Sequence, residues 1–299
     1  MTSWTVKTRK KFSRLSLAWF MRSMLFASRL MPYSLGVLLG GLLGHLAFYI
    51  LPRDRERAIS HLTSVFGDKE RAWIRKTAHR CFAHLGKAML ETMLLDPGRL
   101  SRVVEFQGHE NLRRALERGR GAVYFTGHIG NWEMMAAAVA EKFPLSVIAA
   151  PLEPEQLSDM IVRLRAAKGV RTILRSRPGA SRELIRIFRE NRILGLLIDQ
   201  DTEVEGAFVD FMGKPAWTPI AAASIAIKFN APVLFGHITR MSNSKHRLTV
   251  EGPLDIIRTG DDTKDIILNT ALFTKKIEEC ILRNPEQWVW MHRRWRRQP

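Results

Sequence analysis

From residue 122 onward, short apolar runs alternate with amphipathic stretches, and this alternation constrains the fold more than any other feature of the chain. Short apolar runs suit buried strands, whereas apolar residues spaced by threes and fours suit helices that cover a sheet. Strands are predicted over 122–126, 145–149, 171–174, 193–198, 232–239 and, as an edge strand, 247–251. Helices are predicted over 132–142, 156–168, 182–189, 221–229 and 262–282. The pattern predicts an α/β fold in which helices flank a central, mostly parallel sheet.

An apolar stretch near the N-terminus, residues 35–51, is the second constraint on the fold. It is at the short end of the length that an α-helix needs to cross a bilayer. Basic residues lie on both sides, in segment 7–14 before it and at Arg53, Arg55 and Arg57 after it, so the positive-inside rule gives no crossing direction. We therefore expect a membrane-anchoring helix that dips into one leaflet, with a buried core helix as the alternative.

Three glycines, Gly36, Gly40 and Gly44, recur at every fourth position of this stretch. They fall on one helical face, where another helix can approach closely. The spacing of apolar residues after the stretch predicts a helical layer over 54–95, which ends at the Asp-Pro-Gly sequence 96–98. The chain is thus predicted to divide into a basic N-terminus with its anchoring helix, residues 1–52, and an α/β domain, residues 53–299.

The formal net charge of +18 calls for an anionic partner or surface, because self-repulsion of this size is otherwise a cost. Nucleic acid and anionic lipid both qualify. The sequence contains no recognisable nucleic-acid module, and an apolar stretch such as 35–51 has no use in one. An anionic membrane surface is therefore the predicted partner, and nucleic acid is not.

The two cysteines, Cys81 and Cys280, lie far apart in the sequence and have no metal-type or redox-type spacing, which indicates reduced, buried thiols.

Candidate chemistry lies where the predicted strand 122–126 passes into the predicted helix 132–142, in the sequence Phe-Thr-Gly-His-Ile-Gly-Asn-Trp-Glu. Open α/β sheets bind their ligands at this edge. Gly127 and Gly130 permit a tight turn and a close approach of the backbone to a substrate. Asn131 is the expected N-cap of the helix, which places Glu133 in its first turn.

His128 is expected to stand before this turn with its ring reaching back to Glu133. A carboxylate on one ring nitrogen fixes the tautomer and leaves the other nitrogen to take a proton from a hydroxyl. Such a dyad contains a base but no enzyme nucleophile. Acyl transfer by direct attack of the acceptor hydroxyl needs only a base, a thioester and donors that stabilise the oxyanion. Backbone amides of the glycine turn are available as these donors. The spacing alone also fits a surface histidine and a helix-start carboxylate. A metal site is not predicted, because no third ligand is evident.

Four sequence blocks occur in an order that resembles the lipid A biosynthesis (late) acyltransferases, the lauroyl and myristoyl transferases of lipopolysaccharide assembly. The blocks are Gly-His-Ile-Gly-Asn-Trp-Glu at 127–133, Leu-Ile-Asp-Gln-Asp at 197–201, Phe-Val-Asp-Phe-Met-Gly-Lys-Pro-Ala at 208–216, and Pro-Glu-Gln-Trp-Val-Trp-Met-His-Arg-Arg-Trp at 285–295. The resemblance spans nearly the whole chain. It implies a fold like that of the glycerolipid acyltransferases and catalysis without a cofactor.

The resemblance also implies roles for residues outside the first block. Arg165 and Asp199 match positions beside the dyad: Arg165 suits bidentate phosphate binding, and Asp199 suits positioning that arginine or the acceptor sugar. Asp201 is a further candidate for substrate binding, as are Gly127 and Asn131 of the first block. In the tail, His292, Arg293 and Arg294 are the residues most apt to touch substrate, although the interleaved Trp and Arg residues favour an interfacial aromatic belt.

By this resemblance, the expected reaction moves a fatty acyl group from a thioester, on acyl carrier protein or coenzyme A, to a hydroxyl of a phosphorylated glycolipid, a lipid A precursor. Glu133, where glycerolipid relatives carry Asp, favours that acceptor. The expected location is the bacterial inner membrane, with the catalytic domain on its cytoplasmic face. Two alternatives remain open: acylation of a glycerolipid or another membrane lipid, and a non-catalytic basic protein that binds membranes.

Overall fold

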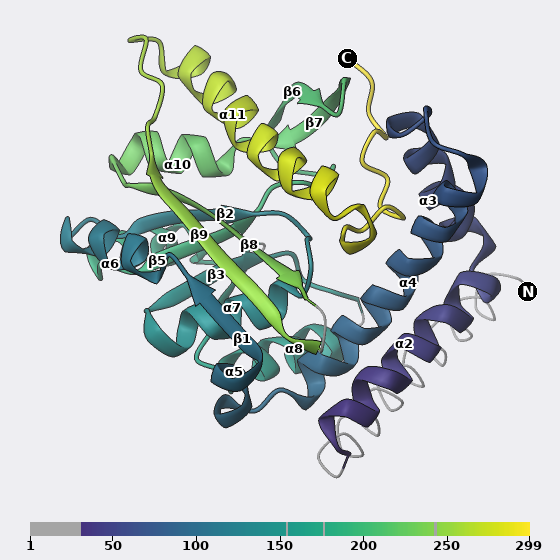
Figure 1. The fold of residues 1–299 in the computed structure, drawn as a ribbon. Coiled ribbons are helices and arrows are strands. Elements are labelled where there is room, and N and C mark those ends of the chain that lie inside the picture. The colour runs from purple at the N-terminus through teal and green to yellow at the C-terminus, as the bar shows by residue number, and fades with distance from the viewer. Residues whose placement is uncertain (1–30, 154, 176, 242–243) are drawn as a thin grey trace, which may run out of the picture.

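The computed structural model describes residues 31–299 apart from residues 154, 176, 242 and 243. The predictions that concern the basic segment 7–14 therefore lie outside the described residues. The described residues form a seven-stranded sheet in the order β1-β9-β8-β2-β5-β3-β4 (Figure 1). Its strands are β1 Val104–Gln107, β2 Ala122–Thr126, β3 Leu145–Ala149, β4 Arg171–Leu174, β5 Ile193–Leu197, β8 Val233–Arg240 and β9 His246–Leu254. A separate hairpin joins β6 Gly206–Phe211 to β7 Lys214–Pro219.

Strands β8, β2, β5, β3 and β4 pair in parallel, and β9 runs antiparallel to β8. The prediction of an α/β fold with a mostly parallel sheet is confirmed. The prediction of an edge strand at 247–251 is wrong, because β9 lies between β8 and β1. The sequence did not indicate β1, since this strand is short and alternates exposed polar residues with half-buried or buried apolar ones.

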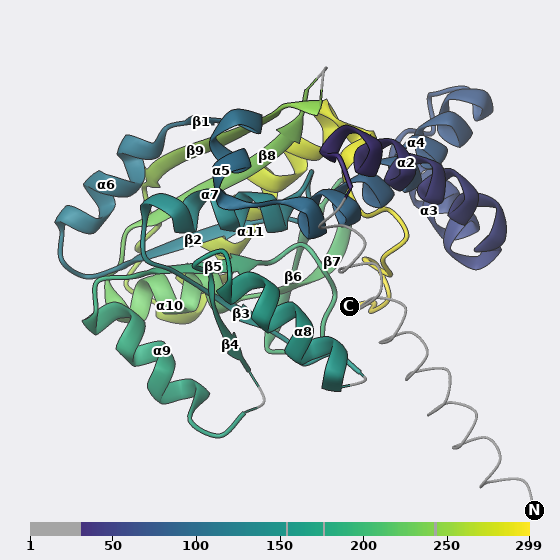
Figure 2. The same ribbon diagram turned by 90° about the horizontal axis from the view of Figure 1, so that it is seen from below.

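Helices cover both faces of the sheet (Figures 1 and 2). On one face, α6 His109–Glu117 and α7 Trp132–Lys142 contribute Leu112 and Met134 to one core cluster. On the other face, α9 Ala180–Arg189, α10 Ala221–Phe229 and α11 Asp262–Arg283 contribute Ile187, Ala223 and Phe273 to a second cluster. Helix α8 Glu155–Ala166 packs beside β4, and η2 Pro285–Gln287 follows α11.

The helical layer before the sheet has a break that was not predicted. Instead of one stretch over 54–95, α3 Pro52–Val65 and α4 Arg71–Leu94 are separate helices, and α5 Pro97–Val103 begins where the layer was expected to end. Asp96 caps α5 by accepting a hydrogen bond from the backbone N–H of Arg99 at 3.0 Å. The Asp-Pro pair therefore starts a helix here, because Pro is well suited to the first helical position.

Both cysteines, Cys81 and Cys280, are buried free thiols, as predicted.

The apolar N-terminal stretch forms α2 Tyr33–Ile50, which packs lengthwise against α4 (Figure 1). The glycine face is the contact surface, as predicted. A methyl group added at Gly40 would lie 2.5 Å from the carbonyl oxygen of Gly86 on α4, and one added at Gly44 would lie 2.2 Å from that of Phe82. Both distances are impossible contacts, so only glycine permits this backbone separation.

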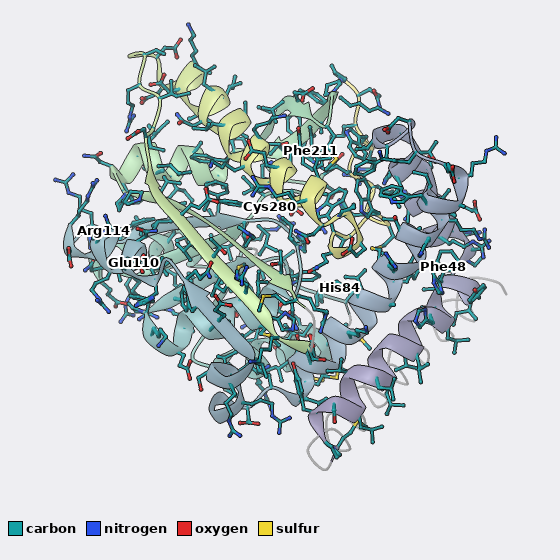
Figure 3. All side chains as sticks on the ribbon, in the orientation of Figure 1. Phe48, His84, Glu110, Arg114, Phe211 and Cys280 are labelled. Atoms are coloured by element: carbon teal, nitrogen blue, oxygen red, sulfur yellow. The ribbon has the colours of Figure 1, made fainter. Side chains whose placement is uncertain are left out.

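The two sides of α2 have different environments. Phe48 is buried and packs edge-on against Phe82 of α4, between the two helices (Figure 3). The opposite side is apolar and exposed: Leu35, Leu38, Leu42, Leu43, Leu46, Tyr49 and Ile50. Among the described helices, α2 alone has the length and composition to enter a bilayer, which is consistent with membrane association. The division of the chain at residue 52 stays a prediction, and α2 packs closely on the segment beyond it.

The glycine contact generates the first prediction. In a helix, Gly→Ala usually stabilises by about 1 kcal/mol. Gly40→Ala should instead lower stability by about 1–3 kcal/mol, because the new methyl group meets the backbone of α4. Gly41→Ala is the matched control on the same helix, since its methyl group meets only the flexible side chain of Lys87. Thermal unfolding in detergent micelles measures both. Equal midpoints for the two variants would contradict the close contact.

Candidate active site

The order of the strands brings two chemically active side chains together. Strands β2 and β5 are parallel neighbours, with Thr126 opposite Leu197 at their carboxyl ends. The pairing continues one residue further, where the N–H of Ile198 donates to the carbonyl of Thr126 at 3.1 Å. The residues that follow each strand therefore lie side by side at the edge of the sheet where α/β proteins bind ligands. One of these residues is His128, and the other is Asp199.

Asp199 accepts three hydrogen bonds at this edge. Its Oδ1 is 2.7 Å from Nδ1 of the His128 ring, and its Oδ2 is 2.7 Å from both the backbone nitrogen of His128 and Nε1 of Trp288. The carboxylate side chain is 0% exposed, whereas the His128 side chain is 21% exposed. Because an ionised carboxylate only accepts, Nδ1 must carry the proton. Nε2 of the neutral ring is then free to act as a base.

The buried carboxylate of Asp199 remains ionised. Burial raises its pKa, but the charge of His128 and the hydrogen bonds from His128 and Trp288 outweigh burial and hold the pKa at about 2. A carboxylate that stays ionised at neutral pH orients the imidazole and stabilises the imidazolium that forms when the ring takes a proton.

Gly127 and Gly130 make the close packing of the turn possible. A methyl group on Gly127 would lie 2.9 Å from the side chain of Ile277 and 3.0 Å from Oδ2 of Asp199. Gly130 has φ +62°, and a methyl group there would lie 1.9 Å from the carbonyl oxygen of Ile238. The glycines therefore serve the approach of His128 to Asp199 and of the turn to β8.

Asn131 begins α7 as predicted, because its side chain accepts a hydrogen bond from the backbone N–H of Met134 at 3.0 Å. This cap places Glu133 in the first turn. The predicted contact between Glu133 and the His128 ring does not form. Glu133 instead pairs with Arg165 of α8, with Nε to Oε2 at 2.9 Å and Nη2 to Oε1 at 2.5 Å. This bidentate geometry is the strongest available to an arginine and a carboxylate, and it takes up both oxygens of Glu133.

The partners of the two carboxylates are thus exchanged relative to the prediction. The sequence predicted that Asp199 would position Arg165 or the acceptor sugar, but Asp199 contacts His128 and Glu133 contacts Arg165. A second cation lies close to this ion pair. Lys168 donates to the backbone carbonyl of Thr92, and its burial lowers its pKa to about 8 against the opposing influence of Glu133.

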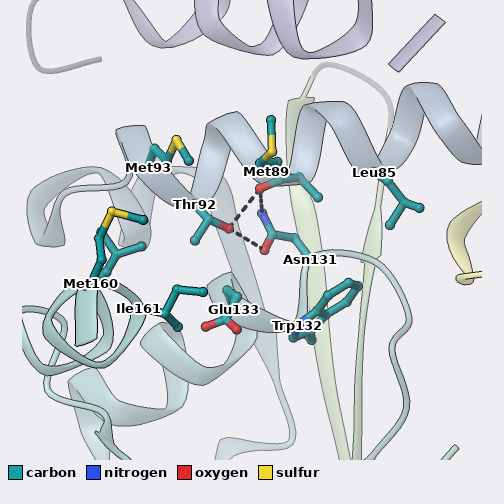
Figure 4. A pocket seen from close by; sticks show the side chains of 11 residues that line it. Leu85, Met89, Thr92, Met93, Asn131, Trp132, Glu133, Met160 and Ile161 are labelled. Carbon is teal, nitrogen blue, oxygen red and sulfur yellow. Dashed lines mark hydrogen bonds between the residues drawn. The ribbon is translucent and has the colours of Figure 1, made fainter. Parts of the chain in front are cut away.

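A mostly apolar cavity of about 210 Å³ adjoins the turn (Figure 4). It lies between α4, the start of α7 and α8, and its lining includes Leu85, Met89, Met93, Met160, Ile161 and Leu164. Trp132 joins the cavity to the histidine, because it lines the cavity and its ring centroid lies 4.9 Å from that of His128. Glu133 and Asn131 also line the cavity. An apolar cavity beside a histidine that can act as a base suits a long hydrocarbon chain with a reactive group at its head.

The chain is similar to known proteins over nearly its whole length. The family described as bacterial lipid A biosynthesis acyltransferase matches residues 5–297. The chain belongs to this family. The lipid A biosynthesis palmitoleoyltransferase of Escherichia coli (strain K12) is 23% identical over 294 residues, which is 95% of this chain and 92% of that protein.

Other relatives of this lipid A acyltransferase family member are mannoside acyltransferases. The phosphatidylinositol mannoside acyltransferase of Mycolicibacterium smegmatis is 30% identical over 148 residues, 48% of this chain and 48% of that protein. The corresponding protein of Mycobacterium tuberculosis (strain CDC 1551 / Oshkosh) is 30% identical over 135 residues, 44% of this chain and 42% of that protein. The chain thus matches less than half the length of these mannoside relatives.

The remaining predicted substrate residues of this family member lie in the C-terminal tail or pair with it. Arg294 is 0% exposed, and its guanidinium donates to the carbonyl of Trp217 and to Oγ1 of Thr218. A guanidinium fixed in the interior in this way does not reach a substrate, so this prediction is not supported. Asp201 pairs with Arg296 and accepts the backbone N–H of Arg297 at 3.1 Å, which fastens the tail. Arg293 is exposed beside them.

The tail itself corrects one sequence interpretation. Trp288 and Trp290 are fully buried, so an interfacial aromatic belt is wrong for these two indoles. Trp288 donates to Asp199, a role that sequence reasoning missed, because nothing local in a tail rich in Trp and Arg indicates a contact with a residue so far back in the chain. His292, which the sequence placed among the tail residues most apt to touch substrate, lies near enough to the pair to feel its charges. Burial lowers its pKa to about 4, with Asp199 raising it and His128 lowering it.

The Asp199 contacts generate the second prediction, a pH dependence of stability. A carboxyl group whose pKa is lowered on folding stabilises the fold above its unfolded-state pKa of about 4. This contribution is lost as the pH falls from there through the folded value of about 2. Wild type should therefore exceed Asp199→Asn in free energy of unfolding at neutral pH, and the gap should close between about pH 4 and pH 2. Urea unfolding across this range measures the gap, and a constant gap contradicts the assignment.

Proposed function

We propose that this protein transfers a fatty acyl group from a thioester to a hydroxyl of a phosphorylated glycolipid in the membrane, with His128 as general base and Asp199 as its orienting carboxylate. The observation that carries the proposal is the 2.7 Å contact between Nδ1 of His128 and Asp199, with Trp132 connecting that ring to an apolar cavity. A base beside a hydrocarbon cavity places a lipid thioester next to the atom that removes the proton.

The proposed reaction needs no covalent intermediate on the enzyme. Nε2 of His128 takes the proton of the acceptor hydroxyl while its oxygen attacks the thioester carbonyl carbon. The tetrahedral intermediate collapses, the carbon–sulfur bond breaks, and the imidazolium returns the proton to the leaving thiolate. Asp199 stabilises the imidazolium between these two steps through the hydrogen bond to Nδ1. Each step conserves atoms and charge with donor and acceptor alone.

Two backbone amides of the glycine turn, the segment expected to supply oxyanion donors, already donate within the protein. The N–H of His128 donates to Asp199 at 2.7 Å, and that of Gly130 donates to the carbonyl of Gln287 at 2.8 Å. The cations beside the cavity, Arg165 and Lys168, are therefore the groups that we assign to the anionic parts of the substrates. In this assignment Glu133 positions Arg165 through their bidentate pair, in place of the predicted contact with the histidine.

We assign the cavity to the acyl chain. Its lining is mostly apolar over α4 and α8, and the polar residues Thr92, Asn131 and Glu133 also line it. Burying apolar chain surface contributes roughly 25 cal/mol per Å², so such a lining holds the hydrocarbon and leaves the thioester near the polar residues. Methionines such as Met89, Met93 and Met160 adapt to a flexible chain because their own side chains are flexible.

A lipid A precursor is the acceptor that we propose first. The family match covers nearly the whole chain, and the relative that matches over 95% of it is a lipid A biosynthesis palmitoleoyltransferase. The net charge of +18 suits an acceptor with several phosphates, an acidic carrier protein as donor and the anionic inner face of a bacterial inner membrane. The exposed apolar side of α2 suits the same membrane.

A phosphatidylinositol mannoside, or another phosphorylated glycolipid, is the second candidate acceptor. It is favoured by the 30% identity to the mannoside acyltransferases over part of the chain. The His128–Asp199 pair and the cavity fit either acceptor, since both present a hydroxyl beside a phosphate.

The third prediction tests the function directly. Purified protein in micelles is given acyl thioesters of several chain lengths on acyl carrier protein or coenzyme A, together with one acceptor. The acceptors are a lipid A precursor, a phosphatidylinositol mannoside, glycerol 3-phosphate and lysophosphatidate, and mass spectrometry identifies the product. Wild type should acylate a glycolipid, best from acyl carrier protein and with the lipid A precursor preferred. His128→Ala should lose at least about 10²-fold in turnover.

Each alternative gives a different result in this assay. Acylation of the mannoside alone would replace the lipid A precursor as acceptor and leave the reaction standing. Transfer only to glycerol 3-phosphate or lysophosphatidate would contradict a glycolipid acceptor. Near-normal turnover by folded His128→Ala would contradict the mechanism.

A further inference from the structure

A fully buried carboxylate, Glu91 of α4, lies outside the catalytic pair and has no part in the reaction described above. It is 0% exposed and accepts hydrogen bonds from four other elements. Nη1 and Nη2 of Arg240 on β8 approach its two oxygens at 2.5 and 2.6 Å. Nε2 of His246 on β9 and the hydroxyl of Tyr33 on α2 are each 3.3 Å from Oε1. Nδ2 of Asn131, the N-cap of α7, is 3.1 Å from Oε2.

Such a group costs free energy unless every lone pair is used, because a buried charge loses its hydration. Burial raises the pKa of Glu91, but hydrogen bonds from His246 and Arg240 hold it at about 2. The carboxylate is therefore ionised and fixed in place by donors on several sides. His84 of α4 extends the cluster, with its Nδ1 3.5 Å from Nε of Arg240; its place on α4 is shown in Figure 3.

Asn131 is held at both ends of its amide. Its Nδ2 donates to Glu91 and, at 3.2 Å, to the carbonyl of Ala88. Its Oδ1 accepts from the N–H of Met134 at 3.0 Å and from the hydroxyl of Thr92 at 3.1 Å (Figure 4). Capping α7 needs only the oxygen. The bonds to Nδ2 are additional, and they fix which way the amide and the start of the helix face.

The neighbouring turn is tied to the same cluster by a second route. Gln287 accepts the N–H of Gly130 on its carbonyl at 2.8 Å. Its side chain bonds the backbone of Arg240, with Oε1 2.7 Å from the nitrogen and Nε2 3.1 Å from the carbonyl oxygen. Arg240 thus supports Gly130 through Gln287 and Asn131 through Glu91. The segment between His128 and Glu133 has both of its central residues attached to one buried ion pair.

We infer that Glu91 is a positioning residue for the proposed reaction, and that through Asn131 it sets the position of His128 against the cavity. The inference rests on the proposed function. A displacement of the turn by about 1 Å moves the base out of reach of the acceptor hydroxyl, and errors of this size cost about 10²-fold in rate. The proposed substrate contacts lie elsewhere, in the apolar lining of the cavity and at Arg165 and Lys168, so KM should be little affected.

Two variants disturb this support from opposite sides. Glu91→Gln keeps the shape of the side chain but turns an NH₂ group toward donors. Asn131→Asp keeps an oxygen to cap α7, leaves the Glu91–Arg240 pair in place and sets a carboxylate against Glu91. Asp265→Asn is the matched control: Asp265 is a buried carboxylate on α11 that accepts from the N–H and hydroxyl of Thr259 at 2.8 and 2.7 Å, far from the turn in sequence and on another helix.

The fourth prediction follows from these variants in the acyl transfer assay. Glu91→Gln and Asn131→Asp should each lower kcat about 10- to 100-fold with KM for both substrates within about twofold of wild type. The two losses should not multiply in the double variant, because both act through one contact. Asp265→Asn should lower the midpoint of thermal unfolding and leave kcat unchanged.

The inference is overturned if folded Glu91→Gln keeps the kcat of Asp265→Asn, or if the losses in the double variant multiply. Full turnover by His128→Ala in the same assay would instead overturn the proposed function, and this inference with it. The two failures are therefore distinguishable.

Discussion

The site depends on one buried carboxylate that accepts three hydrogen bonds. Asp199 binds the ring and the backbone of His128 and the indole of Trp288, and these contacts outweigh its burial and keep its pKa low. Each of these donors is brought to Asp199 by a different part of the fold. The pairing of β2 with β5 places the two residues side by side, Gly127 lets the chains approach, and the C-terminal tail must return across the sheet edge to deliver Trp288. The geometry of the base is thus set by the tertiary fold.

The sequence predicted the local features of this site but not which carboxylate contacts His128 and which contacts Arg165. The glycine turn and the N-cap at Asn131 follow from residue types within a few positions, and both are present. The partner of His128 was predicted wrongly because Glu133 is nearest in sequence, whereas its position in the first turn of α7 directs it to Arg165 of α8. That Asp199 lies beside His128 depends on the strand order, which the alternation of strands and helices does not specify.

Helix α4 connects the parts of the molecule that the sequence treated separately. One side of it contacts the glycine face of α2, another lines the cavity, and Glu91 reaches the start of α7. The spacing of Gly36, Gly40 and Gly44 predicted a helix contact, but only the structure shows that its partner also forms the proposed lipid site. Tyr33 of α2 bonds Glu91, so the apolar helix, the cavity and the catalytic turn share one support.

The central claim is that Asp199, and not Glu133, is the carboxylate on His128. The direct measurement is proton NMR of protein labelled with ¹⁵N-histidine, because an imidazole Nδ1–H that donates to a carboxylate gives a resolved low-field signal. The account predicts this signal for His128 in wild type and in Glu133→Gln, with its assignment confirmed by its loss in His128→Ala, and predicts that Asp199→Asn removes it or shifts it upfield. Loss of the signal in Glu133→Gln with retention in Asp199→Asn would contradict the account.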